Sequence, residues 1–437
     1  MDPSAQLAPY LRHLEECSTF RWYGRVTKAV GHVVESEGPF CSLGECCEIV
    51  DPQGGAHPGE IVGFRGSTVL SMPLQELDGI RYGDRIVTWG AHPTIRVGEE
   101  LLGRVIDGAG NPLDSGPAYR AREQWPLHAA GPLPLERVLI RQALGCGIRA
   151  IDAFLTCGRG QRVGIFGGSG VGKSTLVGMM ARGSAADVTV VGLVGERGRE
   201  VREFLEKSLG EEGRRRAVVV VSTSDQSPLL RIRAGLAATA VAEYFCSRNK
   251  HVLLVVDSLT RFAMAQREIG LAAGEPPTTK GYTPSVFTLL AHLLERAGNF
   301  DGSSITGFYS VLMEGDDQQD PLSDALRALL DGHIVLDRRL ATRNHYPAIS
   351  ILDSLSRLMP AVCSSEHLEK ARRLRLLLSA YTDAEDLIRV GAYQKGLDPL
   401  LDQAISVVPA LNTFLQQGAD EKVSLEATVA ALKALPG

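Results

Sequence analysis

One short stretch, GGSGVGKSTL at residues 167–176, restricts this 437-residue chain more than any other part of its sequence. It contains the pattern G-x-x-x-x-G-K-[ST] and follows the apolar run QRVGIF, so it lies where a strand is expected to turn into a helix. Glycines there let backbone N–H groups surround phosphate oxygens, and the start of the helix adds positive potential. The residues expected to hold phosphates are Gly167, Gly168, Ser169, Gly170, Val171, Gly172, Lys173, Ser174 and Thr175. The motif therefore predicts phosphate binding, with Lys173 neutralising the outer phosphates and the Ser174 hydroxyl as a ligand of Mg²⁺.

Apolar strand candidates recur along the central part of the chain, separated by helical stretches. They cover residues 161–167, 188–196, 217–224, 251–257 and 304–312. Strands that are apolar throughout are buried on both faces, as in parallel sheets covered by helices on both sides. The central part is therefore predicted to form an α/β domain with a mainly parallel sheet.

Two of these strands end in a carboxylate. Asp257 ends HVLLVVD, at the sheet edge where ligands bind in open α/β folds, and is the candidate for holding Mg²⁺ directly or through water. Its alternative role is a cap for the next helix. Glu196 ends VTVVGLVGE and is the candidate base that polarises a water aimed at the γ-phosphate, with Arg197 beside it. The alternative for this Glu-Arg pair is a surface ion pair.

The regions on either side of the central part differ from it in composition and in the pattern of apolar residues. Short segments between residues 22 and 94 are rich in β-branched residues and punctuated by glycine, which predicts a small closed or nearly closed β-barrel. A proline-bearing connector, WPLHAAGPLPLERV, leads into the central unit, which is expected to span 95–362. The tail, 363–437, has helical patterning throughout.

The first 21 residues can form a short amphipathic helix with Leu7, Tyr10, Leu11 and Leu14 on one face. We interpret this extension as a helix that docks on a partner; the alternative is a frayed terminus.

Charge and composition exclude several classes of protein. A formal net charge of −5 argues against tight nonspecific binding to a phosphate backbone, so no nucleic-acid partner is expected. The eight cysteines include no C-x-x-C pair, which is typical of free thiols in a reducing cytoplasm. No apolar stretch approaches the roughly 20 residues that span a bilayer. The chain is therefore expected in the cytoplasm, attached to a membrane only through partners.

Four longer stretches, at 147–176, 190–204, 251–277 and 302–341, carry a resemblance to a known family. Together they resemble the rotary-type export ATPases, which are related to the catalytic subunit of F-type ATP synthase and drive type III protein secretion. Within them, AMAQREIG and EGDDQQDP are more similar to the flagellar export ATPase than to the injectisome version.

The resemblance implies a RecA-like ATPase domain between the barrel and the helical domain, and a ring of six identical subunits with ATP and Mg²⁺ at each interface. The family's nucleotide and catalytic positions match Lys173, Ser174, Glu196, Arg197 and Asp257 without substitution. The resemblance adds Arg357, in ILDSLSRLM, as an arginine finger that reaches a neighbour's site.

Two positions differ from the synthase pattern. The synthases close the adenine pocket with aromatic residues, and the tail offers Tyr381 and Phe414, neither of which the sequence places against the base. Tyr309 stands where the synthases carry a glutamine near the phosphate, so a sensor role there is in doubt.

The resemblance also implies partners. These are a stator-like regulator at the N-terminal helix, a central coiled-coil stalk protein at loop 313–321, export chaperones with their substrates, and an export gate at the inner membrane. The candidate stalk contacts, which could instead form a solvated acidic loop, are Glu314, Asp316, Asp317, Gln318 and Gln319.

The leading hypothesis is an ATP-hydrolysing homohexamer that releases chaperones and energises the unfolding and export of flagellar proteins. The near alternative is an injectisome ATPase. A noncatalytic nucleotide-binding ring subunit would lack the acidic base, so Glu196 argues against that class. A hexameric nucleic-acid translocase would carry a basic, aromatic pore loop, and the acidic EGDDQQDP loop argues against it.

Overall fold

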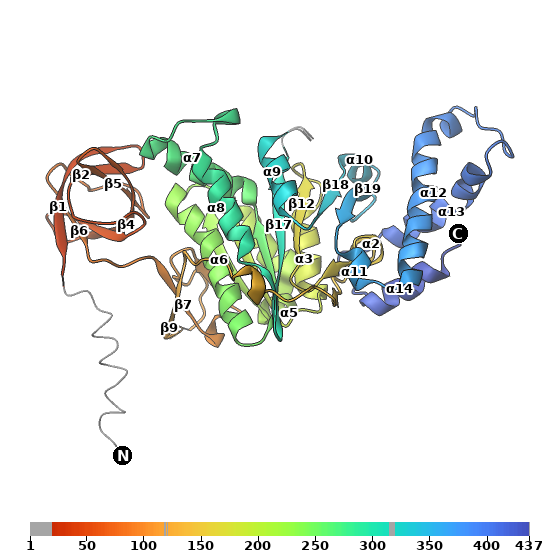
Figure 1. Ribbon diagram of the computed structural model, residues 1–437, viewed down its shortest axis with the longest axis horizontal. Helices are drawn as coiled ribbons and strands as arrows, with labels where there is room; N and C mark the ends of the chain where they lie inside the picture. Colours follow the sequence, from red (N-terminus) through yellow and green to blue (C-terminus); the bar gives the residue numbers. More distant parts are fainter. Residues whose placement is uncertain (1–19, 118, 120, 314–319, 437) are drawn as a thin grey trace, which may run out of the picture.

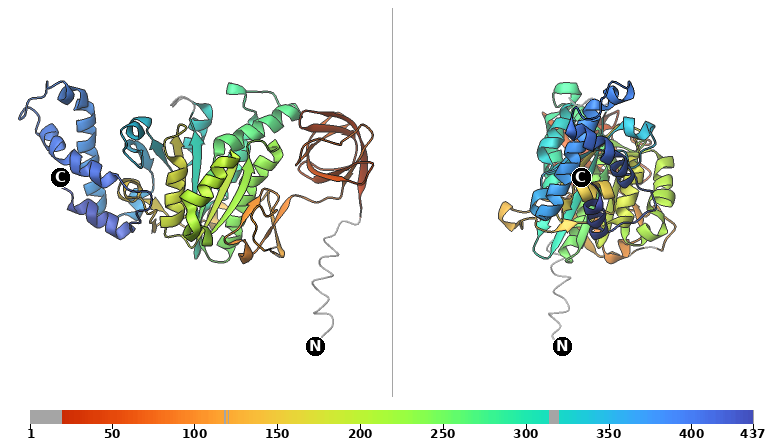
Figure 2. Two further views of the ribbon diagram at one scale, coloured as in Figure 1. Left: turned by 180° about the vertical axis from the view of Figure 1, so that it is seen from behind. Right: turned by 90° about the vertical axis from the view of Figure 1, so that its right-hand side faces the viewer.

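A computed structural model describes residues 20–117, 119, 121–313 and 320–436 (Figure 1). The barrel, the helix-covered sheet and the C-terminal helices follow one another along the long axis of the molecule, in the order of the sequence (Figures 1 and 2). The predicted docking helix and the stalk contacts at 314–319 lie outside the described residues. Among the helices of the described part, none is both long and apolar enough to cross a membrane.

The N-terminal unit is a closed barrel whose strands follow the order β1-β2-β5-β4-β3-β6 in the described part of the chain. Alternate side chains of its strands point inward and form a separate apolar core, which includes Val26, Ile49 and Ile86. The predicted barrel is therefore confirmed, and it is fully closed. Its strands are β1 (Trp22–Val30), β2 (Val33–Glu37), β3 (Cys46–Val50), β4 (Ala56–Arg65), β5 (Thr68–Pro73) and β6 (Arg85–Thr88).

The segment after the barrel contributes to the central domain. Strand β7 (Thr94–Val97) pairs with β9 (Glu123–Pro126) in a small sheet of their own. Between them, β8 (Val105–Asp107) runs parallel to β14 and forms one edge of the main sheet. The turn-rich segment 101–114 therefore also holds an edge strand, which its Asp-Gly and Gly-Asn-Pro turns obscured in the sequence. The short elements of this part of the chain are η1 (Glu99–Leu101), η2 (Pro134–Glu136), β10 (Ala143–Leu144) and β11 (Cys157–Gly158).

The central sheet has the order β19-β18-β12-β17-β15-β13-β14-β8 within the described residues. The strands from β18 to β8 are parallel, whereas β19 (Ile349–Ser356) is antiparallel to β18 (Gly332–Leu336) and β16 (Gly298–Phe300) is antiparallel to β17. All predicted central strands are confirmed. They are β12 (Arg162–Gly167), β13 (Val188–Glu196), β14 (Ala217–Thr223), β15 (His251–Asp257) and β17 (Ser303–Leu312).

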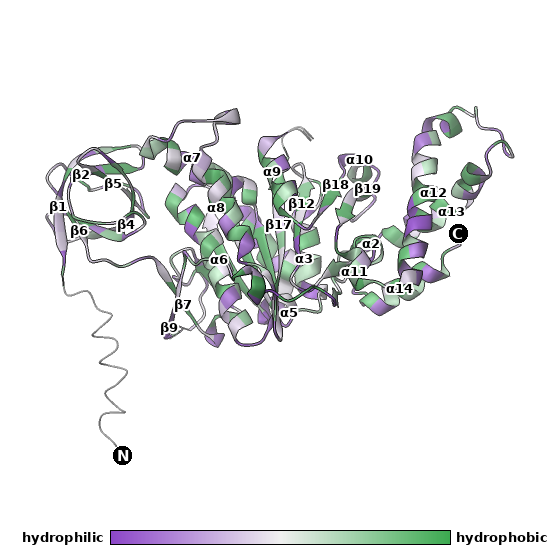
Figure 3. Ribbon diagram, in the orientation of Figure 1, coloured by the Kyte–Doolittle hydropathy of each residue, from purple (hydrophilic) through white to green (hydrophobic). Residues whose placement is uncertain are grey.

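Both faces of this sheet are buried, as the apolar strands predicted. In β13, Val190 and Val194 join one core cluster, whereas Val191 and Leu193 join the other on the opposite face. Figure 3 shows the hydrophobic strands of the sheet between helices of mixed hydrophobic and hydrophilic residues. One face is covered by α6 (Pro228–Ser247), α7 (Leu259–Ala273), α8 (Pro284–Glu295) and α9 (Pro321–Leu329). The other is covered by α2 (Arg149–Phe154), α3 (Lys173–Gly183), α4 (Gly198–Glu203), the π-helical turn η3 (Phe204–Leu209) and α5 (Gly210–Arg215).

The C-terminal part is helical, as expected. The long helix α12 (Ser365–Arg389) packs against α13 (Pro399–Leu415), and α14 (Leu425–Ala434) returns to pack on α2. Ser364, Asp398 and Ser424 cap the three helices by accepting hydrogen bonds from backbone N–H groups. The multidomain α/β fold with barrel, parallel sheet and helical end is thus confirmed. The remaining short helices are η4 (Thr279–Gly281), α10 (Arg338–Thr342) and α11 (Met359–Val362).

Candidate active site

A cavity of about 460 Å³ opens where β12, β13 and β15 end. The ends of these strands lie side by side because the sheet is parallel and its register pairs Leu193 of β13 with Asp257 of β15. Elements that are far apart in the sequence therefore share this edge. The lining residues are Gly168, Ser169, Gly170, Gly172, Lys173, Ser174, Thr175, Glu196, Arg197, Glu200, Glu203, Phe204, Lys207, Ser208, Asp257, Arg261 and Leu312.

The glycine-rich loop connects β12 to α3, as its motif predicted. Gly170 and Gly172 have φ angles of 79° and 91°, in the left-handed region that side chains with a Cβ rarely adopt. A Cβ atom on Gly172 would also lie 3.5 Å from a ring carbon of Tyr346. The loop therefore requires glycine at these positions, and it places backbone N–H groups at the start of α3.

Lys173 begins α3 and points into this region. Its side chain is buried, and within the described part of the chain its Nζ atom has no hydrogen-bond partner. Burial lowers the pKa of Lys173, while the carboxylates of Asp257 and Glu196 oppose that effect. A buried ammonium without a partner is costly unless an anion approaches it. The site therefore fits phosphate oxygens.

Asp257 ends β15 and is almost fully buried. Its Oδ1 atom accepts a hydrogen bond from the Ser310 hydroxyl, which holds the carboxylate in one orientation. Ser174 lies across the same cavity in the first turn of α3, where its side chain is exposed. A hydroxyl, a carboxylate and phosphate oxygens are the hard oxygen ligands that Mg²⁺ prefers, so these residues fit the metal.

Glu196 ends β13 and faces the same cavity. Burial raises its pKa to about 7, and the nearby charge of Asp257 and a hydrogen bond with Glu200 add to the increase. Arg261, at the start of α7, opposes this rise, with its Nε atom 3.5 Å from Oε1 of Glu196. A carboxyl group with a pKa near neutrality can accept a proton at physiological pH and give it up again.

Arg197 lies at the rim of the cavity. Its side chain is 73% exposed, and its Nη1 atom is 3.7 Å from Oε1 of Glu200. The structure therefore brings Arg197 to the site, where its ion pair among the described residues is this exposed one with Glu200.

Arg357 does not face this cavity. It follows β19, and its backbone N–H donates to the Asp331 carbonyl at 3.0 Å, beside the first residue of β18. The other end of β18 lies next to Gly167, and the four residue steps between them span roughly 13 Å. Arg357 is exposed at the sheet edge opposite the glycine-rich loop.

The structure adds two residues that the sequence analysis missed. Arg261 was missed because it lies in the first turn of α7 and its partner, Glu196, is far away in the sequence. Tyr346 lies against the glycine-rich loop, is 42% exposed and precedes a proline in a loop. Its contact with Gly172 joins residues far apart in the sequence, so no local pattern marks it.

The aromatic residues that the sequence considered lie elsewhere. Tyr381 lines a separate cavity of about 470 Å³ between the edge of the sheet and the C-terminal helices, and Phe414 is buried in an apolar core. Tyr309 is fully buried, with its hydroxyl in the field of Arg162 and Arg296 rather than in the nucleotide cavity. Its neighbour Ser310 is the residue of β17 that contacts Asp257.

Comparisons with known proteins show the family to which the chain is similar. Residues 147–356 match the model of the ATP synthase alpha/beta family, nucleotide-binding domain, and residues 363–434 match that of the T3SS EscN ATPase C-terminal domain. The flagellum-specific ATP synthase of Bacillus subtilis is 48% identical over 97% of each chain. That of Salmonella typhimurium is 52% identical over 94% of this chain and 93% of its own. The type 3 secretion system ATPase of Sinorhizobium fredii is 48% identical over 93% of this chain and 90% of its own.

Solved structures are also similar. The assembled ATPase EscN from the type III secretion system of enteropathogenic E. coli superposes with a TM-score of 0.89 at 44% identity, covering 94% of this chain and 98% of EscN. The same ATPase in complex with its central stalk EscO has a TM-score of 0.86 at 43% identity, with the same coverage of both chains.

Proposed function

Because this chain belongs to the family of flagellum-specific and type III secretion ATPases, we propose that it hydrolyses ATP in a ring of six copies. The energy would release chaperones and drive the unfolding and export of flagellar proteins through a type III apparatus. The nucleotide-binding domain is that of the ATP synthase alpha/beta family, and the flagellar relatives match nearly the whole chain. The proposal places ATP at the ends of β12, β13 and β15.

The observation that carries the proposal is the buried Lys173 ammonium, which faces two carboxylates and has no hydrogen-bond partner among the described residues. Lys173 and the N–H groups at the start of α3 would bind the outer phosphates of ATP. Mg²⁺, held by the Ser174 hydroxyl and the Asp257 carboxylate, would supply positive charge to those phosphates. Glu196 would orient the attacking water and accept its proton, and Arg197 would meet the γ-phosphate from the rim.

Arg357 would act on a neighbouring subunit. It is exposed on the side of the sheet opposite its own glycine-rich loop, so its role in hydrolysis would be at the site of another copy. A cation inserted from outside stabilises the charge that develops in the transition state of phosphoryl transfer. Hydrolysis would therefore require assembly.

The test is the ATPase rate per subunit as a function of protein concentration, for the wild type and for Arg357→Ala. We expect the wild-type rate to rise cooperatively with concentration and the variant to lose this rise while it still binds nucleotide. Glu196→Gln should reduce turnover on the order of 100-fold or more. Equal, concentration-independent turnover in the wild type and Arg357→Ala would refute the ring mechanism. Turnover that stays at background and is indifferent to Glu196→Gln would indicate a noncatalytic subunit.

The flagellar assignment and the injectisome alternative can be separated by function in cells. The flagellar assignment predicts that the gene restores motility to a strain that lacks its flagellar export ATPase. Rescue of needle-complex secretion without rescue of motility would favour the injectisome role. The 48% identity to the type 3 secretion system ATPase of Sinorhizobium fredii is the reason to test that role. Strong stimulation of hydrolysis by RNA or DNA, with none by export partners, would instead indicate a translocase.

We propose partners for this chain by analogy with those of its relatives. EscN is known in complex with its central stalk EscO, and we infer that loop 313–321 binds a comparable coiled-coil stalk here. The N-terminal extension would bind a stator-like regulator, and an export gate would hold the ring at the inner membrane from the cytoplasmic side. Charge reversal at Asp316 and Asp317 should reduce the rise in ATPase rate that a purified stalk protein causes. An unchanged rise would contradict this assignment of the loop.

We also propose that 22–94, 95–362 and 363–437 behave as separate units. Limited proteolysis should then cut near the two junctions before it cuts within the units.

A further inference from the structure

We propose that Gln161 is a positioning residue for the arginine that completes the neighbouring subunit's site. Its side-chain amide binds the residue before Arg357 and the carbonyl group that accepts from the Arg357 N–H. This inference rests on the proposed trans-acting role of Arg357, and it adds a residue that no sequence motif assigned to that role.

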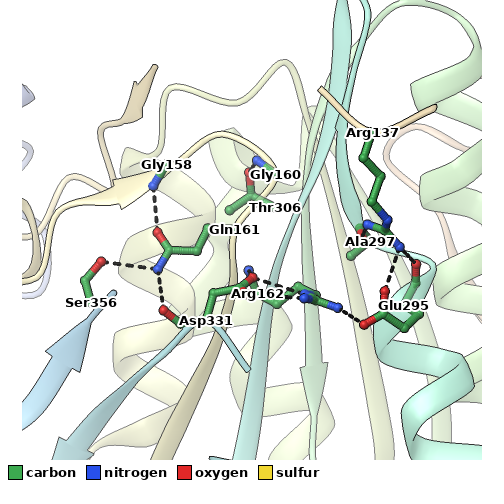
Figure 4. A network of polar contacts seen from close by, with 10 residues as sticks. All are labelled: Arg137, Gly158, Gly160, Gln161, Arg162, Glu295, Ala297, Thr306, Asp331 and Ser356. Atoms are coloured by element: carbon green, nitrogen blue, oxygen red, sulfur yellow. Dashed lines mark hydrogen bonds and ion pairs between the residues drawn. The ribbon is translucent and has the colours of Figure 1, made fainter. Parts of the chain in front are cut away.

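Gln161 lies immediately before β12 and is fully buried. Its Oε1 atom accepts a hydrogen bond from the Gly158 N–H at 2.8 Å (Figure 4). Its Nε2 atom donates to the Asp331 carbonyl at 3.1 Å and to the Ser356 hydroxyl at 3.2 Å. All three bonds hold the amide in one orientation, and they connect three segments of the chain.

Two of these segments border Arg357 directly. The Asp331 carbonyl that accepts from Gln161 also accepts from the Arg357 N–H at 3.0 Å. Ser356 precedes Arg357, and its hydroxyl in turn donates to the Thr156 carbonyl at 2.9 Å. Gln161 therefore contacts both the residue before Arg357 and the group that binds the Arg357 backbone.

Charged side chains hold the Asp331 segment in place from the other side (Figure 4). The Asp331 carboxylate accepts from the backbone N–H of Arg162 at 3.0 Å and from its Nε atom at 3.1 Å. Arg162 also pairs with Glu295, which binds Arg137 at 2.8 Å. This network fixes Asp331, and Gln161 links the Asp331 carbonyl to Ser356, the residue that precedes Arg357.

The chemistry requires an amide at this position. The Oε1 atom faces a donor, whereas the Nε2 atom faces a carbonyl and a hydroxyl whose hydrogen is already donated to Thr156. Gln161→Glu would keep the bond from Gly158 but place an oxygen against the Asp331 carbonyl. The same strand carries the glycine-rich loop at its other end, on the order of 20 Å away, so the subunit's own nucleotide site is remote from the change.

Mixed rings test this proposal. Lys173→Ala removes a subunit's own phosphate binding but leaves its Arg357 intact, whereas Gln161→Glu should do the reverse. Each variant alone should have a low ATPase rate, with Gln161→Glu lowering kcat about 100-fold through misplacement of Arg357 while nucleotide affinity stays at the wild-type value. Mixed in equal amounts, the two should recover activity, because about a quarter of the interfaces then pair an intact loop with an intact arginine. The benchmark is the mixture of Arg357→Ala with Lys173→Ala.

The outcomes separate this inference from the proposed function. Failure of the benchmark mixture to recover would refute the trans-acting arginine. Recovery of the benchmark without recovery of the Gln161→Glu mixture, or wild-type kcat in Gln161→Glu alone, would overturn the positioning role. Thr306→Val is the matched control. It removes the buried Thr306 hydroxyl, which accepts a hydrogen bond from the Gly160 N–H at 2.8 Å. This bond lies next to Gln161 in the sequence but contacts neither Arg357 nor its neighbours. It should retain wild-type kcat at a temperature where it is folded.

Discussion

At the scale of single residues, the site gathers an ammonium and two carboxylates whose side chains are buried or mostly buried. Burial and the nearby charge of Asp257 raise the pKa of Glu196, and burial lowers the pKa of Lys173 beside them. Phosphates and a cation would neutralise these buried charges. The cost of burying these charged groups is therefore what a site for a charged ligand requires.

The pH dependence of hydrolysis should reflect Glu196. A base must be ionised to accept a proton, and burial raises the pKa of Glu196 to about 7, so the rate should fall as pH drops below that value. Arg261 lowers the pKa of Glu196, so Arg261→Gln should raise it and move the acid limb of kcat to higher pH. The check is a pH–rate profile of each variant at saturating ATP. Arg202→Gln, which removes an exposed cation paired with Glu206, should leave the limb in place. An acid limb that does not move in Arg261→Gln would argue against Glu196 as the base.

At the scale of elements, the end of α13 is coupled to the loop that carries Tyr346. Gln417 donates its backbone N–H to the Tyr346 carbonyl at 2.9 Å, and its side chain binds the Arg149 N–H and the Gly147 carbonyl at 2.8 Å each. Gln417 is buried, so these hydrogen bonds are shielded from water. They connect the end of the C-terminal helix α13 to Tyr346, whose ring lies beside the glycine-rich loop. The ring of Tyr346 is therefore in a position to stack on the adenine of a nucleotide whose phosphates bind that loop.

Nucleotide affinity should therefore depend on the ring of Tyr346. Tyr346→Ala should weaken ATP binding by about 1–3 kcal/mol, the range found for a base stacked on an aromatic side chain, whereas Tyr346→Phe should stay near the wild type. A titration with a fluorescent ATP analogue measures this. Tyr381→Ala is the matched control, because Tyr381 lines a different cavity and should leave affinity unchanged. Equal affinity in Tyr346→Ala and the wild type would exclude stacking.

At the scale of the whole molecule, a buried ion pair joins the barrel to the central domain. Arg233 of α6 pairs through its Nε atom with Glu60 of β4, with side chains only 10% and 6% exposed. Nearby, the Ser227 hydroxyl donates to the Leu74 carbonyl at 2.8 Å. The barrel is thus held against the helix that packs on β13 and β15.

Breaking this pair should cost far more than breaking an exposed one. Arg233→Met leaves the Glu60 carboxylate buried without its partner, so the free energy of unfolding should fall by about 3–5 kcal/mol. Arg248→Met, which removes an exposed pair with Glu123, should change the free energy of unfolding far less, because solvent screens that pair. Chemical denaturation of both variants provides the comparison. A small effect in Arg233→Met would mean that water or another group replaces the arginine.

The sequence by itself determined the elements whose signal is local. Continuous apolar runs predicted the parallel strands, the glycine spacing predicted the loop before Lys173, and strand ends predicted Glu196 and Asp257 at one edge. Each of these depends on side-chain periodicity or backbone conformation over a few residues, which the order of amino acids specifies directly.

Only the tertiary structure decided which distant residues meet. Three such meetings join segments that are separated by many residues. They are the pair of Arg261 with Glu196, the position of Tyr346 beside Gly172, and the hydrogen bond from Gln161 to the carbonyl that binds the Arg357 N–H. It also decided that Arg357 projects from the edge of the sheet opposite its own nucleotide loop, because β19 runs antiparallel to β18. Such contacts arise from strand order and packing, and no local pattern in the sequence encodes either.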